Sequence, residues 1–235
     1  MSRKIIARLQ QLLAQEQGVQ VREWGHRRPV ALVYPQEYQV GMGNLGFQTI
    51  YRLLNAHPDL VCERAFLPDP WLLQEYQRTQ TPLLTLESQR PLTDFAVVAF
   101  SVSFEPDYLG VLQILELARL PLTAAARGDG WPWVVAGGAA LMLNPEPLAP
   151  FLDAAFLGEG EEGATAFFDY LTAPSSASRE ERLRQLATRV PGTYVPAAYR
   201  PYYRADGTLG GLEVVAGYPE RIKPPHPRSL EDFPT

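Results

Sequence analysis

The stretch Asp153-Ala-Ala-Phe-Leu-Gly-Glu-Gly-Glu-Glu162 has the pattern of a strand that ends at the edge of a sheet. A short apolar run stops at two glycines and three carboxylates, and apolar residues at helical spacing follow from Ala164 to Leu171. Open α/β folds bind ligands at this kind of edge, where strands end in loops that lead into helices. A second apolar run, Trp133-Val-Val-Ala136, continues into Gly137-Gly138. The sequence therefore predicts two glycine-terminated strands that face one binding crevice.

The chain up to residue 172 repeats this alternation of strands and helices. Apolar runs predict strands at residues 29–34, 60–67, 95–102, 133–136 and 153–156. Helical patterns predict helices at residues 44–54, 71–78, 108–118 and 164–171. The third run is apolar almost throughout, as expected of a parallel strand buried on both faces. Five strands alternating with helices predict a doubly wound parallel sheet with right-handed crossovers.

Other segments lie on either side of this sheet domain, which we assign to residues 29–172. Residues 1–28 are predicted as an N-terminal helical extension, because apolar side chains at helical spacing run through 3–17. Residues 173–222 are predicted as a helix and β-hairpin extension, with Asp206-Gly207 as the hairpin turn. Residues 223–235 are rich in proline and are predicted as a linker toward another domain.

The composition excludes several classes of protein. The chain is 46% hydrophobic and 20% charged, as expected of a soluble globular protein. Its apolar runs are far shorter than a membrane span, and the N-terminus has no apolar signal core, so we expect a cytoplasmic location. The single Cys62 excludes an internal disulfide and any iron–sulfur or cysteine-rich zinc site made by this chain alone. The net charge of −5 gives no reason to expect nucleic-acid binding or attraction to a membrane.

Gly41-Met-Gly-Asn-Leu-Gly46 matches the dinucleotide-binding signature G-x-G-x-x-G by letter. In that signature the first glycine ends the strand, whereas here about six residues separate the predicted strand end at Tyr34 from Gly41. Glu63 lies at roughly the spacing of a ribose-binding acid. The alternative is a turn and helix cap, with Asn44 as the capping residue. A nicotinamide or flavin site therefore stays an alternative.

The carboxylates Glu159, Glu161 and Glu162 have three interpretations: acid/base groups, metal ligands, or acids that stabilise a helix N-terminus. The helix dipole favours acids at such a terminus, and the same acids would repel a phosphate. None of the chain's histidines stands near them to complete a metal site. We therefore favour the helix-terminus interpretation, and the sequence assigns no catalytic residue and no metal ligand to this chain.

Gly137-Gly138 removes side chains where the fourth strand ends, which allows an extended ligand to approach the backbone. The alternative is a tight turn between strand and helix. Ser101 and Ser103 end the preceding strand, and their hydroxyls are able to hydrogen-bond a ligand in the same crevice. Both interpretations stay open on the sequence alone.

Several of these motifs together resemble the N-terminal domain of B12-binding-domain radical SAM proteins, and a large uncharacterised subfamily of them most closely. The resemblance covers nearly the whole chain. It rests on Tyr34-Pro35, Tyr38-x-Val40-Gly41-Met42-x-Asn44-Leu45-Gly46-Phe47, Cys62-Glu63-Arg64, Leu86-Glu87-Ser88 with Pro91-Leu92, Ala136-Gly137-Gly138, Asn144-Pro145-Glu146-Pro147, Gly158-Glu159-Gly160-Glu161 and Ser229-Leu-Glu-Asp-Phe-Pro234.

Two motifs of such proteins are missing. The cluster motif C-x-x-x-C-x-x-C is absent, so this chain alone can neither hold the 4Fe–4S cluster nor cleave S-adenosylmethionine. The motif D-x-H-x-x-G, by which many cobalamin domains supply a histidine to cobalt, is absent too. Radical SAM relatives commonly lack that histidine, so the resemblance still allows cobalamin.

The resemblance implies a flavodoxin-like fold of strand order 2-1-3-4-5 and a cobalamin-binding-type module that works with a radical SAM barrel. That barrel would belong to a missing portion of the protein or to a separate chain, and it would carry the 4Fe–4S cluster and S-adenosylmethionine. The alternatives are a nucleotide-dependent oxidoreductase and a degenerate docking domain without cofactor. The expected cofactor contacts are Gly41, Asn44, Ser101, Ser103, Gly137, Gly138, Gly158 and Gly160.

Overall fold

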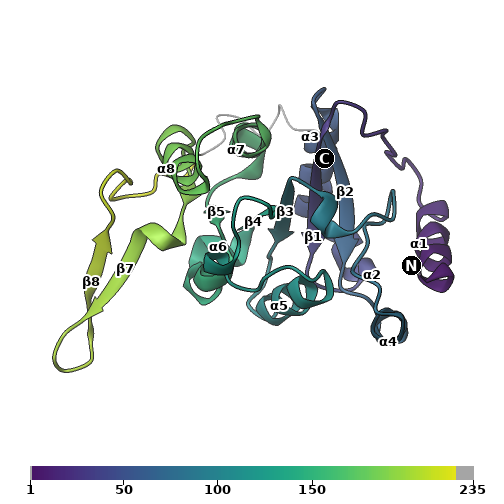
Figure 1. Cartoon of the computed structure of the whole chain (residues 1–235), viewed down its shortest axis with the longest axis horizontal. Helices are drawn as coiled ribbons and strands as arrows, with labels where there is room; N and C mark the ends of the chain where they lie inside the picture. The colour runs from purple at the N-terminus through teal and green to yellow at the C-terminus, as the bar shows by residue number, and fades with distance from the viewer. Residues whose placement is uncertain (1, 226–235) are drawn as a thin grey trace.

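A six-stranded sheet forms the centre of the computed structural model, which describes residues 2–225 (Figure 1). Its strand order is β2-β1-β3-β4-β5-β6. The first five of these strands are parallel, and β6 is antiparallel to β5. The strands are β1 (Arg28–Tyr34), β2 (Leu60–Phe66), β3 (Val97–Ser101), β4 (Trp133–Gly137), β5 (Ala154–Phe156) and β6 (Thr193–Tyr194). The predicted order 2-1-3-4-5 and the flavodoxin-like, doubly wound class are confirmed.

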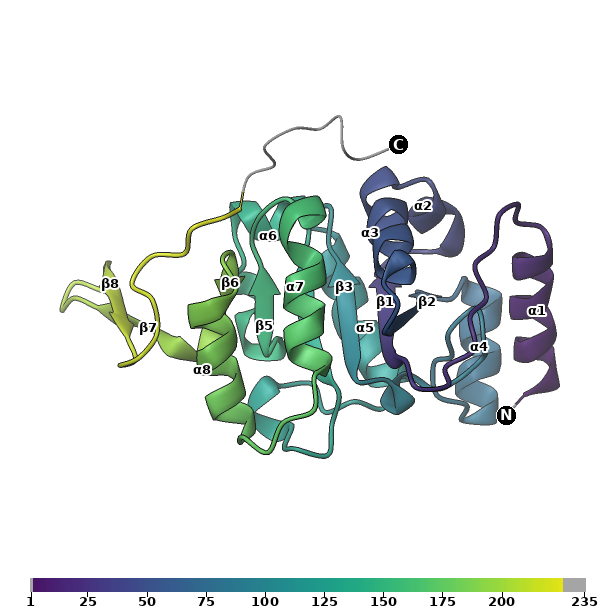
Figure 2. The same cartoon turned by 90° about the horizontal axis from the view of Figure 1, so that it is seen from above.

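Helices cover both faces of the sheet. Figures 1 and 2 show α3, α7 and α8 on one face and α4 and α5 on the other. The helices are α1 (Arg3–Ala14), α2 (Tyr38–Met42), α3 (Leu45–Ala56), α4 (Pro70–Thr79), α5 (Asp107–Leu117), α6 (Ala139–Leu143), α7 (Gly160–Thr172) and α8 (Arg179–Arg189), with 3₁₀ turns at Leu92–Asp94, Ala124–Ala126, Glu146–Phe151 and Pro196–Ala198.

The central strands are buried on both faces, which explains their continuous apolar sequence. In β3, Val97 and Val98 are both completely buried although their side chains point to opposite faces. The register aligns Leu32, Ala99 and Val135 across β1, β3 and β4. These three residues lie on one face of the sheet, just behind its carboxyl edge.

Three short elements were not predicted. Helices α2 and α6 have five residues each, too few for a helical period to appear in the sequence. Strand β6 has two residues and lies in the segment predicted as an extension. Helix α8 packs beside α7, where the Tyr170 hydroxyl donates to Gln185 Oε1 at 2.7 Å. The sheet domain therefore continues beyond residue 172, with one further strand and one further helix.

The predicted hairpin is confirmed as β7 (Tyr199–Tyr203) and β8 (Leu209–Val214). It projects away from the sheet (Figure 1). Residues 226–235 lie outside the described residues, and with them most of the predicted linker 223–235, including Ser229–Pro234. Among the helices of residues 2–225, none is long and apolar enough to cross a membrane.

Candidate functional site at the carboxyl edge of the sheet

A cavity of about 440 Å³ opens at the carboxyl ends of β1, β3, β4 and β5. It lies on the face of the sheet that α3 and α7 cover, and it extends back between these helices and the strands. Seven of the eight residues expected to contact a cofactor line it: Asn44, Ser101, Ser103, Gly137, Gly138, Gly158 and Gly160. The structure therefore gathers into one cavity residues that are spread over more than a hundred positions of the sequence.

Asn44 joins the loops that follow β1 and β3. Its side-chain oxygen accepts from the Phe47 backbone N–H at 2.9 Å and so caps α3, as predicted. Its amide nitrogen donates to Ser103 Oγ at 3.0 Å. Because both polar atoms of this side chain are engaged, Asn44 positions the two loops, and a ligand would meet the hydroxyl of Ser103 beside it.

Gly138 lets the loop after β4 pass directly against the loop after β3. Its φ of 113° is open only to glycine, and a Cβ atom there would lie 2.4 Å from the Val102 carbonyl oxygen. The two loops are also joined by the hydrogen bond from Val102 N–H to the Gly137 carbonyl at 2.8 Å. Gly137 itself has only Phe156 atoms nearby, none closer than 3.4 Å. Gly137 therefore leaves the cavity mouth open, whereas Gly138 is required by the fold.

The glycines after β5 also have neighbours from the protein itself. A Cβ atom on Gly158 would lie 2.5 Å from Pro225, and one on Gly160 would lie 2.4 Å from Ile50. Gly160 thus brings the start of α7 close to α3, and Gly158 lets the C-terminal segment return to the mouth. Protein atoms therefore pack closely against both glycines.

Gly41, the eighth expected contact, does not line the cavity. It is buried in α2, where a Cβ atom would lie 2.6 Å from the Phe66 ring and 3.0 Å from Tyr34. Gly41 lies inside α2 and not at the end of β1. The glycine pattern 41–46 therefore lacks the strand-to-helix turn of a dinucleotide site. The structure gives Gly41 a packing role.

Glu63, the candidate ribose-binding acid, lies away from this cavity. It is buried in β2, and its carboxylate accepts from Trp24 Nε1, the Thr85 hydroxyl and the Ser88 hydroxyl, each at 2.6 Å. The neighbouring Arg64 donates to Glu87 Oε1 at 2.7 Å. The resemblance motifs at 62–64 and 86–88 are therefore a buried polar network that holds the sheet edge together.

The carboxylates Glu159 and Glu161 stand at the N-terminus of α7 and border the cavity mouth, which agrees with the favoured interpretation. The side chain of Glu162 is outside the described part. The segments that form this edge are residues 35–47, 101–109, 137–147 and 157–162, and their sequences contain no lysine, arginine or histidine. The edge is therefore apolar and acidic.

Sequence reasoning missed the inner walls of the cavity. These are apolar side chains from the middle of strands and from helix faces: Leu32, Ile50, Ala99, Val135, Ala164, Phe167 and Phe168. The small residues Ala99 of β3 and Ala164 of α7 both line the cavity, and alanine within an otherwise bulky apolar run was the only available signal. Among the described residues, no group of three or more His, Cys, Asp or Glu side chains is placed to hold a metal ion.

One comparison with known proteins found a match. A family model described as "Radical SAM proteins, N-terminal" matches residues 46–196, from the start of α3 to just beyond β6. No curated protein matches the chain. The matched residues include six of the seven expected contacts that line the cavity and exclude the N-terminal helix and the hairpin.

Proposed function

This chain belongs to the family of N-terminal domains of radical SAM proteins, and from that premise we propose that it is the cobalamin-binding module of such a protein. The observation that carries the proposal is the cavity at the carboxyl edge of the sheet. It is lined by the loops after β1, β3, β4 and β5, as expected for a ligand at the topological switch point of a doubly wound fold.

The size of the cavity fits one part of the cofactor. A volume of about 440 Å³ holds roughly 30 to 44 non-hydrogen atoms if each takes the 10–15 Å³ that a water centre needs. This is the size of a nucleotide, so the cavity would take the nucleotide tail of cobalamin. Gly137 and the serine hydroxyls at the mouth would contact the rest of the cofactor.

The electrostatics of the edge disfavour a dinucleotide, whose pyrophosphate carries two negative charges, more than cobalamin, whose nucleotide tail carries a single phosphodiester charge. A pyrophosphate group needs backbone amides or cations, and the edge segments supply carboxylates and no basic side chain. The corrin unit with Co(III) carries positive charge and is surrounded by neutral amides, which an apolar and acidic mouth accommodates. Glu63, the acid that would bind the ribose of a dinucleotide, lies away from the cavity and is already engaged by Trp24.

Ser101, Ser103, Gly137 and Gly158 would hold the cofactor, and its cobalt would receive no histidine from the cavity wall. Cobalamin, when bound, would supply methyl-transfer or redox chemistry at cobalt. The 4Fe–4S cluster and S-adenosylmethionine would belong to the catalytic domain, because this chain has a single cysteine. The role of this chain would be to bind the cofactor, orient it and exclude water from its lower face.

The surface around the mouth supports the expected partner, a radical SAM catalytic domain. Large apolar side chains are more than half exposed there, on α2, the start of α3, the loop after β3, the start of α5 and the end of α6: Val40, Leu45, Phe104, Leu109 and Leu143. We call these five residues the apolar rim. Because carboxylates but no basic residues accompany them, the rim fits a protein surface with an apolar centre and basic surroundings.

Cobalamin retention is tested with the purified chain. After incubation with hydroxocobalamin and gel filtration, corrin absorbance should elute with the protein. Ser101→Trp, which fills the mouth, should lower the retained amount at least about tenfold, whereas Ser101→Ala should retain it. If the wild-type chain retains no corrin while its melting temperature shows it to be folded, the cobalamin proposal fails.

Two outcomes of this experiment would favour the alternatives. Retained NADH or flavin in place of corrin would indicate a nucleotide-dependent oxidoreductase. Retention of none of these ligands would favour a docking domain that has lost its cofactor, an alternative consistent with the protein atoms that pack against Gly138, Gly158 and Gly160.

A further inference from the structure

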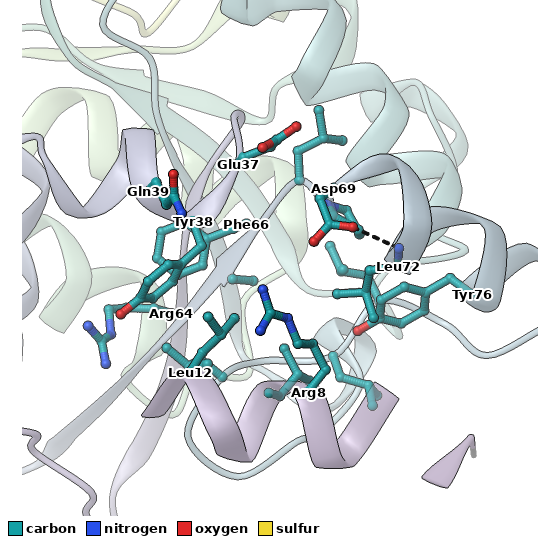
Figure 3. Close-up of a pocket in the computed structure, with 17 residues that line it drawn as sticks. Arg8, Leu12, Glu37, Tyr38, Gln39, Arg64, Phe66, Asp69, Leu72 and Tyr76 are labelled. Carbon is teal, nitrogen blue, oxygen red and sulfur yellow. Dashed lines mark hydrogen bonds between the residues drawn. The ribbon is translucent and has the colours of Figure 1, made fainter. Parts of the chain in front are cut away.

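A second cavity lies at the opposite end of the molecule from the hairpin, between α1, the end of β2 and α4 (Figure 3). Its volume is about 110 Å³, and it shares no lining residue with the cavity at the carboxyl edge of the sheet. By the same allowance of 10–15 Å³ per atom, it holds roughly 8 to 11 non-hydrogen atoms. This is the size of a small metabolite.

Helix α1 closes this second cavity from one side because it is attached to the domain near both ends. At its beginning, the Ser2 hydroxyl donates to Glu75 Oε1 at 2.6 Å. Just after its end, Glu16 accepts from the Tyr38 hydroxyl at 2.8 Å and pairs with Arg64 at 2.9 Å. The middle of the helix spans the space between these attachments. The contact between α1 and α4 therefore encloses the cavity.

Three polar groups of different kinds converge on the space. In Figure 3 the Arg8 guanidinium, the Asp69 carboxylate and the Tyr76 hydroxyl point toward one another across it. Arg8 forms no ion pair with any described carboxylate and donates only to the exposed Gln11 side chain at 3.3 Å. Asp69 uses Oδ1 to cap α4 on the Leu72 N–H at 2.8 Å, which leaves Oδ2 free.

Tyr76 gives an independent sign of a missing ligand. It is 1% exposed, and its hydroxyl donates no hydrogen bond to any described residue. Buried polar groups are nearly always hydrogen-bonded, because desolvation without a partner is costly. A ligand in the cavity would supply the partner that the protein does not.

The rest of the wall is mostly apolar, and leucine is its commonest residue. Its larger apolar members are Leu9, Leu12, Phe66, Leu67, Leu72, Leu83, Leu84 and Leu86, and the polar side chains of Glu37, Tyr38, Gln39 and Arg64 line it as well. A ligand for this site must therefore combine an apolar body with a negative group for Arg8 and Tyr76 and a positive group for Asp69.

We propose that this cavity binds a small α-amino acid with an aliphatic side chain. Its carboxylate would accept from Arg8 and the Tyr76 hydroxyl, its ammonium group would donate to Asp69, and its side chain would lie against the leucines. Leucine, with nine non-hydrogen atoms, matches the volume. The proposal does not rest on cobalamin, since the two cavities have no residue in common.

The test is calorimetric titration of the full chain with L-leucine and three analogues that each lack one feature. 4-Methylpentanoate lacks the ammonium group, 3-methylbutylamine lacks the carboxylate, and glycine lacks the side chain. L-Leucine should bind, and each analogue should bind at least about tenfold more weakly, the effect of losing one charge-assisted hydrogen bond or the apolar contact. Absence of binding by L-leucine, or equal binding by 4-methylpentanoate, would overturn the proposal.

Matched variants locate the site. Arg8→Met, Tyr76→Phe and Asp69→Asn each remove one polar group while conserving shape, and Asn still caps α4. Each should weaken L-leucine binding at least about tenfold without preventing folding, as judged by circular dichroism. Arg3→Met, on the exposed side of the same helix, should bind as the wild type does. If Arg8→Met and Arg3→Met bind L-leucine equally well, the amino acid binds elsewhere and the assignment is wrong.

Discussion

At the scale of single residues, the glycines around the carboxyl-edge cavity differ in what they do. Gly138 lies against the Val102 backbone and Gly160 against the Ile50 side chain, whereas a Cβ atom on Gly137 would make only ordinary contacts with Phe156. Each of these glycines lies at or just after the end of a strand, so the sequence pattern is the same for all of them. Their roles differ because the packing around each one differs.

Replacement of Gly138 tests this distinction. Gly138→Ala must either adopt a φ of 113° or move the Val102 carbonyl, so we expect a loss of about 2 kcal/mol or more in the free energy of unfolding. Urea denaturation measures this loss. Gly128→Ala, at a glycine without neighbours or positive φ, is the control and should be nearly neutral. Equal stability of the two variants would contradict the packing role.

Arg64 carries a second prediction at this scale. It is 2% exposed and pairs with both Glu87 and Glu16. Burial raises the pKa of Glu87, and the Arg64 charge opposes that rise. Arg64→Met leaves two carboxylates without a cation and should cost about 3–5 kcal/mol in urea denaturation. Arg184→Met, which removes an exposed pair with Glu181, should change stability little, and a similar loss in both variants would refute a special role for the buried network.

At the scale of elements, the contact between α1 and α4 includes the hydrogen bond from the Ser2 hydroxyl to the Glu75 carboxylate. Hydrogen bonds from Arg78 and Ser2 lower the pKa of Glu75 from 4.5 to about 2. Between pH 4.5 and about pH 2, Glu75 binds more protons in the unfolded chain than in the folded chain. The stabilisation from Glu75 is therefore complete above pH 4.5 and is lost as the pH falls toward 2.

Urea denaturation of the wild type and Glu75→Gln at several pH values measures this linkage. The wild type should be the more stable of the two at pH 6, and the difference should shrink as the pH falls from 4.5 to 2. Glu116→Gln, at an exposed residue of α5, should show no such trend. A difference that stays constant down to pH 2 would refute the assigned contact.

The hairpin is the least stabilised element. Strands β7 and β8 pair only with each other, and Tyr202, Tyr203, Leu209 and Leu212 are about half exposed or more. An isolated two-stranded ribbon is marginally stable in water. Hydrogen exchange measured by mass spectrometry should therefore be at least about a hundredfold faster in β7 and β8 than in β3. Equal protection would mean that the hairpin is covered in solution.

At the scale of the whole molecule, the apolar rim and the hairpin are two separate exposed apolar surfaces. Association with the catalytic domain tests which of the two is its docking surface. Leu143 is 79% exposed in the apolar rim, and Leu209 is 56% exposed on the hairpin. If the catalytic domain docks over the rim, Leu143→Asp should weaken its association at least about tenfold and leave the melting temperature unchanged. Leu209→Asp, the matched control, should have little effect on association. The reverse result would place the docking surface on the hairpin.

Most element positions were predictable because they depend on local patterns, whereas the strand order was implied by the family resemblance. Continuous apolar runs such as 95–102 indicate buried parallel strands, and the spacing of apolar residues identifies α3, α5 and α7. The short elements α2, α6 and β6 were not predictable, since two to five residues contain less than a full period of any pattern. Seven contacts of the carboxyl-edge cavity were placed together because parallel strands end at one edge.

The sequence by itself determined the class of fold, the end of the sheet at which a ligand site lies and the absence of cluster-binding cysteines, since these follow from pattern and composition. Only the tertiary structure decided which glycines leave space and which are filled by neighbours such as Val102 and Ile50. It alone brought Arg8, Asp69 and Tyr76 to one cavity. The physical reason is that cavities and contacts depend on the relative placement of whole elements, and no local period encodes that placement.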